Sequence, residues 1–326
     1  MRKLIVMPDD SIGPIVEAIA AATRSLRIKM FSLSEPRILD ALVKAHKRRV
    51  KIRVLLNPAR RSGEIQNRGS HQVLMETGID VLDTNPVFAV THEKSMVVDD
   101  TSAIIGSLNW DPENFEQARD FAVVSTDAEE VAEVIECFEA DWSRQPFTPR
   151  SKSNLIWCPE GGRERITAFI DETRHSLYVQ NERFQDTIIV EHLVRAKLRG
   201  VKVHVMTRLS HSLHRRKLVE GFGDLRILRD VGIGVRKVRH MRLHSKVLIG
   251  DKSRAVVGSI NLSSGSFDDR RELAIRLRDR EVVDQLYKVV HEDWRHAHAL
   301  DLTDEALLAG SDSRANKVAA AESVET

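Results

Sequence analysis

Cysteine is nearly absent from this sequence of 326 residues: Cys137 and Cys158 are the only two, and they fall in no metal-ligand spacing. Such a pair predicts neither a disulfide framework nor a zinc site. Aromatic residues make up only 5%, and no stretch approaches the roughly 20 consecutive apolar residues of a membrane-spanning helix. The N-terminal segment MRKLIVMPDDS has too short an apolar run for a signal-peptide core. We expect a soluble, cytoplasmic protein, and a peripheral contact with membrane stays open.

A strong excess of charge is also lacking, because 50 Lys and Arg stand against 48 Asp and Glu. The net charge of +2 therefore indicates no partner by itself. Basic clusters at 44–49, 214–217 and 236–240 are compatible both with solvated faces and with a surface that attracts phosphate. Neither G-x-x-x-x-G-K-[ST] nor G-x-G-x-x-G occurs, so nucleotide-driven chemistry has no support.

What the sequence does contain is an internal repeat. Residues 91–109, THEKSMVVDDTSAIIGSLN, and residues 243–261, LHSKVLIGDKSRAVVGSIN, share the pattern H-x-K-x4-D-x6-G-S-x-N, 152 positions apart. The first copy supplies His92, Lys94, Asp99, Ser107 and Asn109, and the second supplies His244, Lys246, Asp251, Ser259 and Asn261. A repeat without insertion or deletion predicts two copies of one structural unit.

Strands and helices are predicted to alternate around both copies, which favours an α/β fold. Apolar segments at 26–30, 50–56, 94–98 and 103–105 are typical of strands, Ser34-Glu35-Pro36 is typical of a helix start, and 128–142 is a long amphipathic helix. Segment 201–206 repeats 50–55 at an offset of 151, and Asp293-Trp294 repeats Asp141-Trp142 at 152. We place the boundary at 146–152, which gives domains 1–150 and 151–309 and a disordered tail at 310–326.

Each motif brings together an imidazole, an ammonium group and a carboxamide. Alternate residues of a strand share a face, so His92 and Lys94 should point the same way, as should His244 and Lys246. Together these groups suit a phosphoryl oxyanion. Exchange of a phosphodiester through a covalent intermediate needs one group that attacks phosphorus and one that protonates the leaving oxygen, and two histidines fit that division near neutral pH. With lysines and asparagines holding the oxygens, we expect no metal and no cofactor.

Two acids follow in the same arrangement. Asp120 and Glu272 are 152 apart, and each lies 28 residues beyond a histidine (120 − 92 and 272 − 244). We predict that each carboxylate accepts a hydrogen bond from the histidine of its own copy, Asp120 from His92 and Glu272 from His244, and so leaves the other ring nitrogen free. The alternative is an ordinary exposed acid at the start of a strand.

The sequence resembles the phospholipase D superfamily, whose HKD signature both copies match in full, and the resemblance extends from the first strand to about Ala299. It is most similar to the bacterial phospholipase D and cardiolipin synthase-like branch. The resemblance implies two tandem domains, each a mixed β-sheet flanked by helices, related by a pseudo-two-fold axis and sharing one active site. A monomer would then contain an internal pseudo-dimer.

The resemblance also implies roles for the motif residues. His92 would form the phosphohistidine, and His244 would act as general acid and then as general base. Phosphate would be bound by Lys94, Lys246, Asn109 and Asn261, with Ser107 and Ser259 beside them. Asp99 and Asp251 would be structural.

The substrate is open at this stage. We favour a phospholipid slightly, with hydrolysis or transfer to an alcohol as the reaction. A metal-independent endonuclease acting on DNA or RNA is the alternative within the family. A catalytically silent scaffold or binding module is the alternative of another class, and two intact motifs argue against it. His211 and His214, beside the basic residues up to 217, are equally compatible with head-group binding and with a solvated loop.

Overall fold

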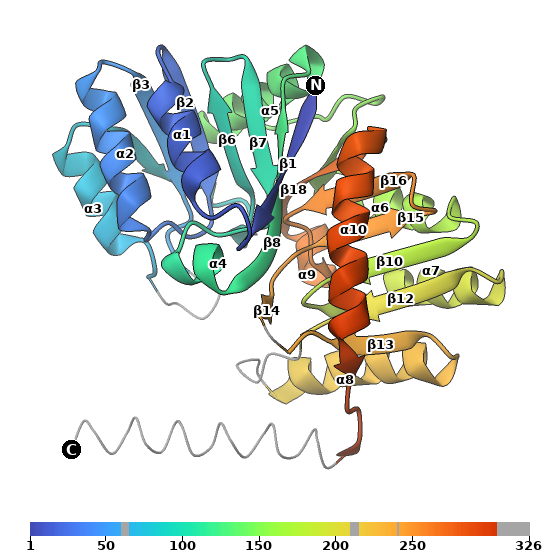
Figure 1. Cartoon of the computed structure of the whole chain (residues 1–326). Helices are drawn as coiled ribbons and strands as arrows, with labels where there is room; N and C mark the ends of the chain where they lie inside the picture. Colours follow the sequence, from blue (N-terminus) through green and yellow to red (C-terminus); the bar gives the residue numbers. More distant parts are fainter. Residues whose placement is uncertain (60–64, 209–214, 240, 305–326) are drawn as a thin grey trace, which may run out of the picture.

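Strands and helices alternate along the chain and form two mixed β-sheets (Figure 1). The computed structural model describes residues 1–59, 65–208, 215–239 and 241–304. The predicted tail at 310–326 lies outside the described residues, as do His211 and His214. Among the described residues, no helix combines the length and the apolar composition that crossing a bilayer requires.

The first half of the chain builds a sheet with the order β1-β8-β7-β6-β2-β3-β4. Its strands are β1 (Arg2–Met7), β2 (Ser25–Met30), β3 (Lys51–Leu56), β4 (Asp80–Asp83), β6 (Lys94–Val98), β7 (Ser102–Gly106) and β8 (Ala118–Ser125). The helices are α1 (Gly13–Ala21), α2 (Pro36–Lys47), α3 (Arg68–Glu76), α4 (Pro112–Glu116) and α5 (Ala128–Trp142). Strands β2, β3 and β4 pair in parallel, and the other neighbours pair antiparallel, so the sheet is mixed.

The second half repeats this arrangement in the order β19-β13-β12-β10-β15-β16-β18, with β9 beside β18. Its strands are β9 (Leu155–Cys158), β10 (Ser176–Gln180), β12 (Lys202–Met206), β13 (Gly234–Lys237), β15 (Val247–Gly250), β16 (Arg254–Gly258), β18 (Arg270–Leu277) and β19 (His298–Ala299), with a separate pair β11 (Phe184–Gln185) and β17 (Leu262–Ser263). The helices are α6 (Gly162–Asp171), α7 (Thr187–Leu198), α8 (Arg215–Asp230), α9 (Ser264–Asp268) and α10 (Arg280–His296). The predicted duplication of one α/β unit is thus confirmed.

Several helix starts are encoded locally. Glu35 caps α2 by accepting a hydrogen bond from the Arg37 backbone N–H, with Pro36 in the first turn, as the sequence predicts. Asp127 and Asp186 cap α5 and α7 in the same way. Each side-chain oxygen satisfies an N–H that the first helical turn leaves without a partner.

Three apolar cores hold the layers together. Helices α1, α2 and α3 bury residues such as Ile15, Ile38 and Leu74 against the outer face of the first sheet. Helices α6, α7 and α8 do the same on the second sheet. The inner faces of both sheets, with α5 and α10, share the third core, in which Phe121 meets residues such as Val257. In Figure 1, α10 stands between the two sheets. The halves are therefore joined by a continuous apolar core.

The two halves also exchange short strands. β5 (Val90–Thr91), from the first half, pairs in parallel with Arg270 and Arg271 of β18. β14 (Arg242–Leu243), from the second half, pairs in parallel with β8 in the equivalent way. Each exchanged strand directly precedes a motif histidine. Each histidine is consequently delivered to the other half of the molecule.

Buried ion pairs follow the same exchange. Arg119 of β8 lies 3.0 Å from Asp293 of α10, and Arg271 of β18 lies 3.2 Å from Asp141 of α5. Both arginines and both aspartates are buried. A buried charge is tolerated only when it is paired, so these reciprocal pairs favour one relative placement of the halves.

Candidate active site

The exchanged strands place each motif histidine against the opposite half. The backbone N–H of His92 donates to the carbonyl oxygen of Arg271 at 2.8 Å, and that of His244 donates to the carbonyl oxygen of Arg119 at 3.2 Å. Arg271 precedes Glu272, and Arg119 precedes Asp120. Each histidine therefore lies beside the predicted acid of the other half.

The hydrogen bonds of the imidazoles show this crossed pairing directly. His92 Nδ1 lies 2.9 Å from Glu272 Oε2, and His244 Nδ1 lies 2.9 Å from both carboxylate oxygens of Asp120. The prediction that each acid holds the histidine of its own copy is therefore wrong, because strand exchange separates them. The role of the acids as partners of the imidazoles agrees with the structure. With Nδ1 engaged, the Nε2 atom of each ring remains for chemistry.

The predicted serines, Ser107 and Ser259, lie beside the two acids Asp120 and Glu272, which form a buried carboxylate layer behind the histidines. Ser107 Oγ donates to Asp120 Oδ1 at 2.6 Å and accepts from the Phe121 backbone N–H at 3.0 Å. Ser259 Oγ accepts from the Leu273 N–H at 3.0 Å, and its carbonyl oxygen lies 3.2 Å from His92 Nδ1. Both serines are fully buried. The structure thus shows these hydroxyl groups in contact with Asp120 and with the backbone beside both acids, and binding of phosphate by the serines stays a prediction.

Asn114 is a member of this layer that the sequence did not reveal. Its side-chain amide donates to Asp120 Oδ2 at 3.0 Å and lies 3.3 Å from His244 Nδ1. The position 152 residues later is Ser266, whose hydroxyl group lowers the pKa of Glu272, so the place beside the acid is repeated but the carboxamide is not. A search limited to repeated residues therefore passes over it.

The two motif lysines take the same pose. Lys94 Nζ donates to the carbonyl oxygen of His92, and Lys246 Nζ donates to the carbonyl oxygen of His244. Their second neighbours differ: Lys94 Nζ lies 4.9 Å from the centroid of the Phe31 ring, whereas Lys246 Nζ lies 3.2 Å from Glu182 Oε2. The two half-sites are thus alike in backbone and unlike in charge.

Electrostatics place both motifs in one site. Burial lowers the pKa of the His92 imidazole well below its ordinary value, and the nearby charges of Lys94 and Lys246 lower it further. His92 Nδ1 lies 3.2 Å from the carbonyl oxygen of Ser259, a residue of the second motif, so the two motifs are close in space. A lowered pKa keeps the His92 imidazole neutral near pH 7, and the neutral ring is the form that can attack phosphorus.

The two acids differ in their electrostatic surroundings. Burial raises the pKa of Asp120, but the imidazole of His244 outweighs burial and the net pKa is lowered. Burial raises the pKa of Glu272, and the charge of Lys94 offsets this only in part. Burial also lowers the pKa of Lys94 well below its usual range. A bound phosphate would favour the charged form of that lysine.

Asn109 and Asn261 each have a buried side-chain amide with a polar atom that is not hydrogen-bonded to the described residues. Both side chains are buried, and the Oδ1 atom of each has no hydrogen-bond partner among the described residues. The oxygen and nitrogen of a carboxamide exchange places on rotation, so either can be the unpaired end. An unpaired buried polar atom costs about 1–3 kcal/mol, which a bound phosphate oxygen would offset.

Asp99 and Asp251 have the structural position that the resemblance implied. Asp99 accepts from the backbone N–H groups of Thr23, Arg24 and Ser25, at 2.9, 2.7 and 2.8 Å. Asp251 accepts in the same way from the N–H groups of residues 174–176. Burial raises the pKa of Asp99, but the backbone donors outweigh it and lower the pKa to about 2. Each acid ties its motif hairpin to the start of a neighbouring strand.

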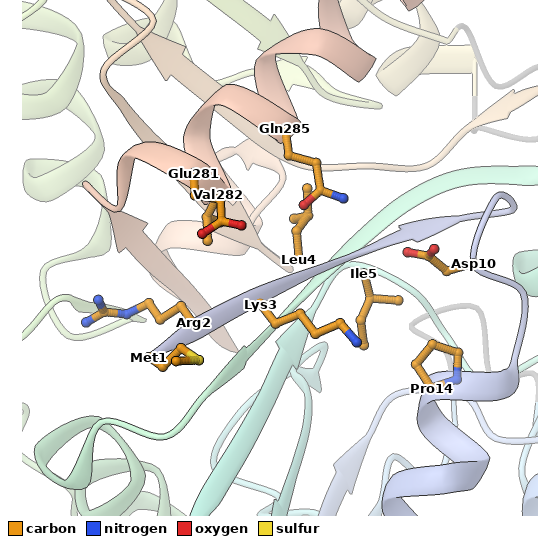
Figure 2. Close-up of a pocket in the computed structure, with 10 residues that line it drawn as sticks. All are labelled: Met1, Arg2, Lys3, Leu4, Ile5, Asp10, Pro14, Glu281, Val282 and Gln285. Atoms are coloured by element: carbon orange, nitrogen blue, oxygen red, sulfur yellow. The ribbon is translucent and has the colours of Figure 1, made fainter.

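A surface hollow elsewhere on the molecule is separate from the motifs (Figure 2). It lies between β1, the segment around Asp10 and Pro14, and the beginning of α10. Its lining includes Lys3 and Glu281, and none of its ten residues belongs to either motif. We therefore assign it no part in the chemistry.

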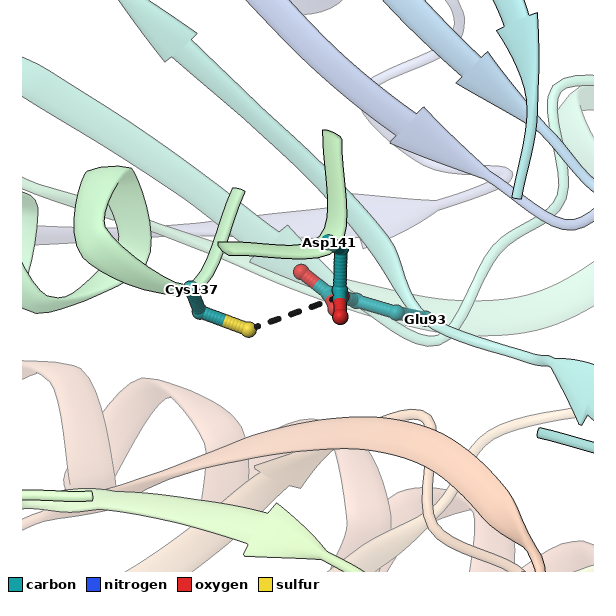
Figure 3. Close-up of side chains that lie close together, drawn as sticks. All are labelled: Glu93, Cys137 and Asp141. Atoms are coloured by element: carbon teal, nitrogen blue, oxygen red, sulfur yellow. Dashed lines mark hydrogen bonds between the residues drawn. The ribbon is translucent and has the colours of Figure 1, made fainter. Parts of the chain in front are cut away.

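Glu93, Cys137 and Asp141 lie together in the interior, as Figure 3 shows, and their ligand atoms are within 4.8 Å of one another. Lys29 Nζ occupies the space among them: it lies 2.9 Å from Glu93 Oε2, 2.6 Å from Asp141 Oδ2 and 3.3 Å from Cys137 Sγ. Burial raises the pKa of the Cys137 thiol, which keeps it protonated. The ammonium group of Lys29 thus takes the position that a cation would need, and the cluster is a buried ion-pair network.

The chain matches the family model described as "Cardiolipin synthase, PLD-like domain" twice, over residues 15–142 and 166–294. It is 30% identical to a phospholipase D of Rickettsia felis over 138 residues, which are 41% of this chain and 66% of the relative. It is 28% identical to the human mitochondrial cardiolipin hydrolase over 158 residues, which are 46% of this chain and 60% of the relative. The chain thus matches somewhat less than two thirds of the length of these curated relatives.

Among solved structures, the phosphatidylserine synthase of Haemophilus influenzae superimposes with a TM-score of 0.72. The superposition covers 98% of this chain and 94% of that one, with 11% sequence identity. At that identity the similarity concerns the fold alone. It extends over both halves, so the relative placement of the two sheets is shared as well.

Proposed function

Because the chain belongs to the family of cardiolipin synthase and phospholipase D-like proteins, whose relatives named above are phosphodiesterase-type enzymes, we propose that it cleaves or exchanges a phosphodiester through a phosphohistidine. The observation that carries the proposal is the pair of imidazoles, each held at Nδ1 by a buried carboxylate of the opposite half. The names of the curated relatives support a phospholipid as the substrate.

In the first step, His92 Nε2 attacks phosphorus. The neutral form that its lowered pKa favours has a free electron pair on this nitrogen once Nδ1 is hydrogen-bonded to Glu272. The N–P bond forms as the bond between phosphorus and the alcohol oxygen breaks. His244 Nε2 gives its proton to the departing oxygen, and Asp120 stabilises the ring through Nδ1.

In the second step, His244 acts in the opposite sense. It takes a proton from water or from an alcohol, whose oxygen attacks phosphorus as the bond to His92 breaks. Both histidines return to their starting states. Water as the acceptor gives hydrolysis, and an alcohol gives transfer.

The phosphoryl oxygens need positive charge and hydrogen-bond donors throughout. Lys94 and Lys246 supply charge, and the buried carboxamides of Asn109 and Asn261 supply donors. Two lysines are enough to balance a phosphodiester anion. The proposal therefore includes no metal ion and no cofactor.

The test is an assay of the purified protein on phosphatidylcholine, phosphatidylglycerol, and single- and double-stranded DNA, all in the presence of a chelator. We expect turnover of at least one phospholipid, unchanged by the chelator, and a phosphatidyl group bound to His92 in enzyme denatured at alkaline pH, where the N–P bond is stable. Cleavage of DNA alone would replace lipid by nucleic acid as the substrate. Turnover that stops in chelator and returns with a divalent ion would refute the metal-free mechanism.

A further inference from the structure

The two half-sites differ most clearly just after the strand beside each motif, at Phe31 after β2 and at Glu182, two residues after the end of β10. Strands β2 and β10 correspond at an offset of 151, and this offset aligns Phe31 with Glu182. Both side chains reach the motif lysine of their own half, Phe31 with its ring at 4.9 Å and Glu182 with its carboxylate at 3.2 Å. A carboxylate therefore stands in the second half-site where the first has an aromatic ring.

Glu182 lies on the reactive side of His244. Because Asp120 holds Nδ1, the reactive nitrogen is Nε2, and Glu182 Oε2 is 3.7 Å from that atom. The Glu182 side chain is 19% exposed, whereas those of His244 and Lys246 are 5% and 1% exposed. An alcohol that leaves or enters beside His244 therefore meets this carboxylate.

The carboxylate of Glu182 is ionised, and its Oε1 atom can accept a hydrogen bond from a ligand. Burial raises the pKa of Glu182, but the charges of Lys246 and His244 outweigh burial and lower it well below its usual range. Lys246 Nζ and His244 Nε2 both lie against Oε2, and Oε1 accepts no hydrogen bond from the residues that the structure describes. An ionised carboxylate oxygen binds hydrogen-bond donors, and ammonium groups most strongly.

At the corresponding position of the first half-site, the described chain has the ring of Phe31 in place of a carboxylate. The ring of Phe31 packs edge to face against the imidazole of His92, with centroids 4.9 Å apart and planes at 63°. An aromatic face accepts cations weakly and hydroxyl groups poorly. The side of the attacking histidine is thus apolar, and the side of the departing alcohol is anionic.

We propose that Glu182 determines which alcohol this enzyme releases or accepts, by accepting a hydrogen bond from an ammonium or hydroxyl group that the alcohol carries near its reacting oxygen. The proposal rests on the function proposed above and extends it to the class of alcohol. Proton transfer stays between His244 Nε2 and the reacting oxygen, so Glu182 neither gains nor loses a proton. Amino alcohols should be preferred over alcohols of the same size without a second donor.

The experiment compares two water-soluble, short-chain phospholipids, one with ethanolamine and one with 1-propanol as the head alcohol. These alcohols have nearly the same size, but ethanolamine ends in an ammonium group and 1-propanol ends in a methyl group. The quantity is the ratio of kcat/KM for the two lipids, which does not depend on the folded fraction of a preparation. The variant is Glu182→Gln, and the control is Glu113→Gln, since Glu113 is 69% exposed and pairs with Arg242.

We expect the wild-type enzyme to prefer the ethanolamine lipid and Glu182→Gln to reduce that preference about tenfold, the effect of about 1.4 kcal/mol. Glu113→Gln should leave the ratio unchanged. The inference is overturned if the wild-type enzyme cleaves both lipids without preference, if Glu182→Gln changes the ratio less than twofold, or if it slows both lipids equally. An enzyme that cleaves neither of these lipids overturns the inference, and the assays on phosphatidylcholine, phosphatidylglycerol and DNA decide separately whether the proposed function holds.

Discussion

The crossed pairing of acids and histidines predicts which step of catalysis each acid supports. Glu272 holds His92, so Glu272→Gln should slow formation of the phosphohistidine. Asp120 holds His244, so Asp120→Asn should slow the steps in which His244 gives or takes a proton. A hydrogen bond to a charged partner contributes about 1.5–3 kcal/mol. Each variant should therefore lose about 10- to 160-fold in the step that it affects.

A substrate whose leaving group departs without a proton separates the two variants. On bis(p-nitrophenyl) phosphate, Asp120→Asn should keep a rapid first release of nitrophenol and then stall, because water no longer has an effective base. It should accumulate phosphoryl-enzyme on His92. Glu272→Gln should show no burst and no accumulated intermediate. Stopped-flow release of nitrophenol and peptide mapping of enzyme denatured at alkaline pH, where the N–P bond survives, measure both quantities.

Peptide mapping also decides what a reversed result means. If Glu272→Gln accumulates the intermediate and the phosphoryl group is on His92, the crossed pairing is refuted. If the same variant accumulates it on His244, the crossed pairing stands and the two histidines exchange roles. The near-identity of the motifs makes this second outcome a test of the assignment itself.

Two further predictions concern stability. Lys29→Met should lower the free energy of unfolding, measured in urea titrations, by about 3–5 kcal/mol, because Glu93 is left buried without a cation. The double variant Lys29→Gln with Glu93→Ser introduces the residue types that the second half has at Gln180 and Ser245, and it should cost clearly less. Equal costs for the two variants would contradict the ion-pair explanation. Asp99→Asn should cost about 1–3 kcal/mol at neutral pH. The pKa of Asp99 is lowered from 3.8 to about 2 in the folded state, so its stabilising effect is present above pH 4 and is lost as the pH falls through about 2. A stability difference between variant and wild type that stays constant down to pH 2 would refute this explanation.

The sequence predicted the duplicated fold because its offset of 152 holds for motif residues that face the site and for Asp141 and Asp293, which face the interior. Hydrophobic alternation then located most strands to within a few residues. Helix α8 and strand β13 had no comparable signal, because Arg215–Asp230 is rich in charge and glycine. Their positions depend on packing against the second sheet.

Which acid holds which histidine could not be predicted from the repeat. The repeat gives only the spacing of 28 residues between His92 and Asp120 and between His244 and Glu272. This spacing is equally compatible with pairs within one half and with pairs between the halves. Only the pairing of β14 with β8, and of β5 with β18, decides between them. Such two-residue pairings leave no periodic pattern in a sequence.

Glu182 was missed for the opposite reason, since a search for repeated residues discards a position where the repeat breaks. Aligning β2 with β10 at an offset of 151 would have shown Phe31 opposite Glu182, within two residues of the ends of strands that lead to the site. In a duplicated enzyme that divides one reaction between two halves, the departures from the repeat carry the division of labour. The same reasoning would have drawn attention to Asn114, opposite Ser266.

The exchange of β5 and β14 means that each repeated half of the sequence does not contain a complete imidazole–carboxylate pair. A polypeptide that ended near residue 150 would contain His92 and Asp120, yet these two belong to different imidazole–carboxylate pairs. A single molecule of either fragment would lack a complete imidazole–carboxylate pair, and mixing the two fragments should restore both pairs at once, as in fragment complementation. Two copies of the first fragment alone would build a symmetric site with aspartate behind both histidines and no Glu182 on either side. Two copies within one chain can therefore differ on the two sides of one site, as Phe31 and Glu182 do beside the motif lysines.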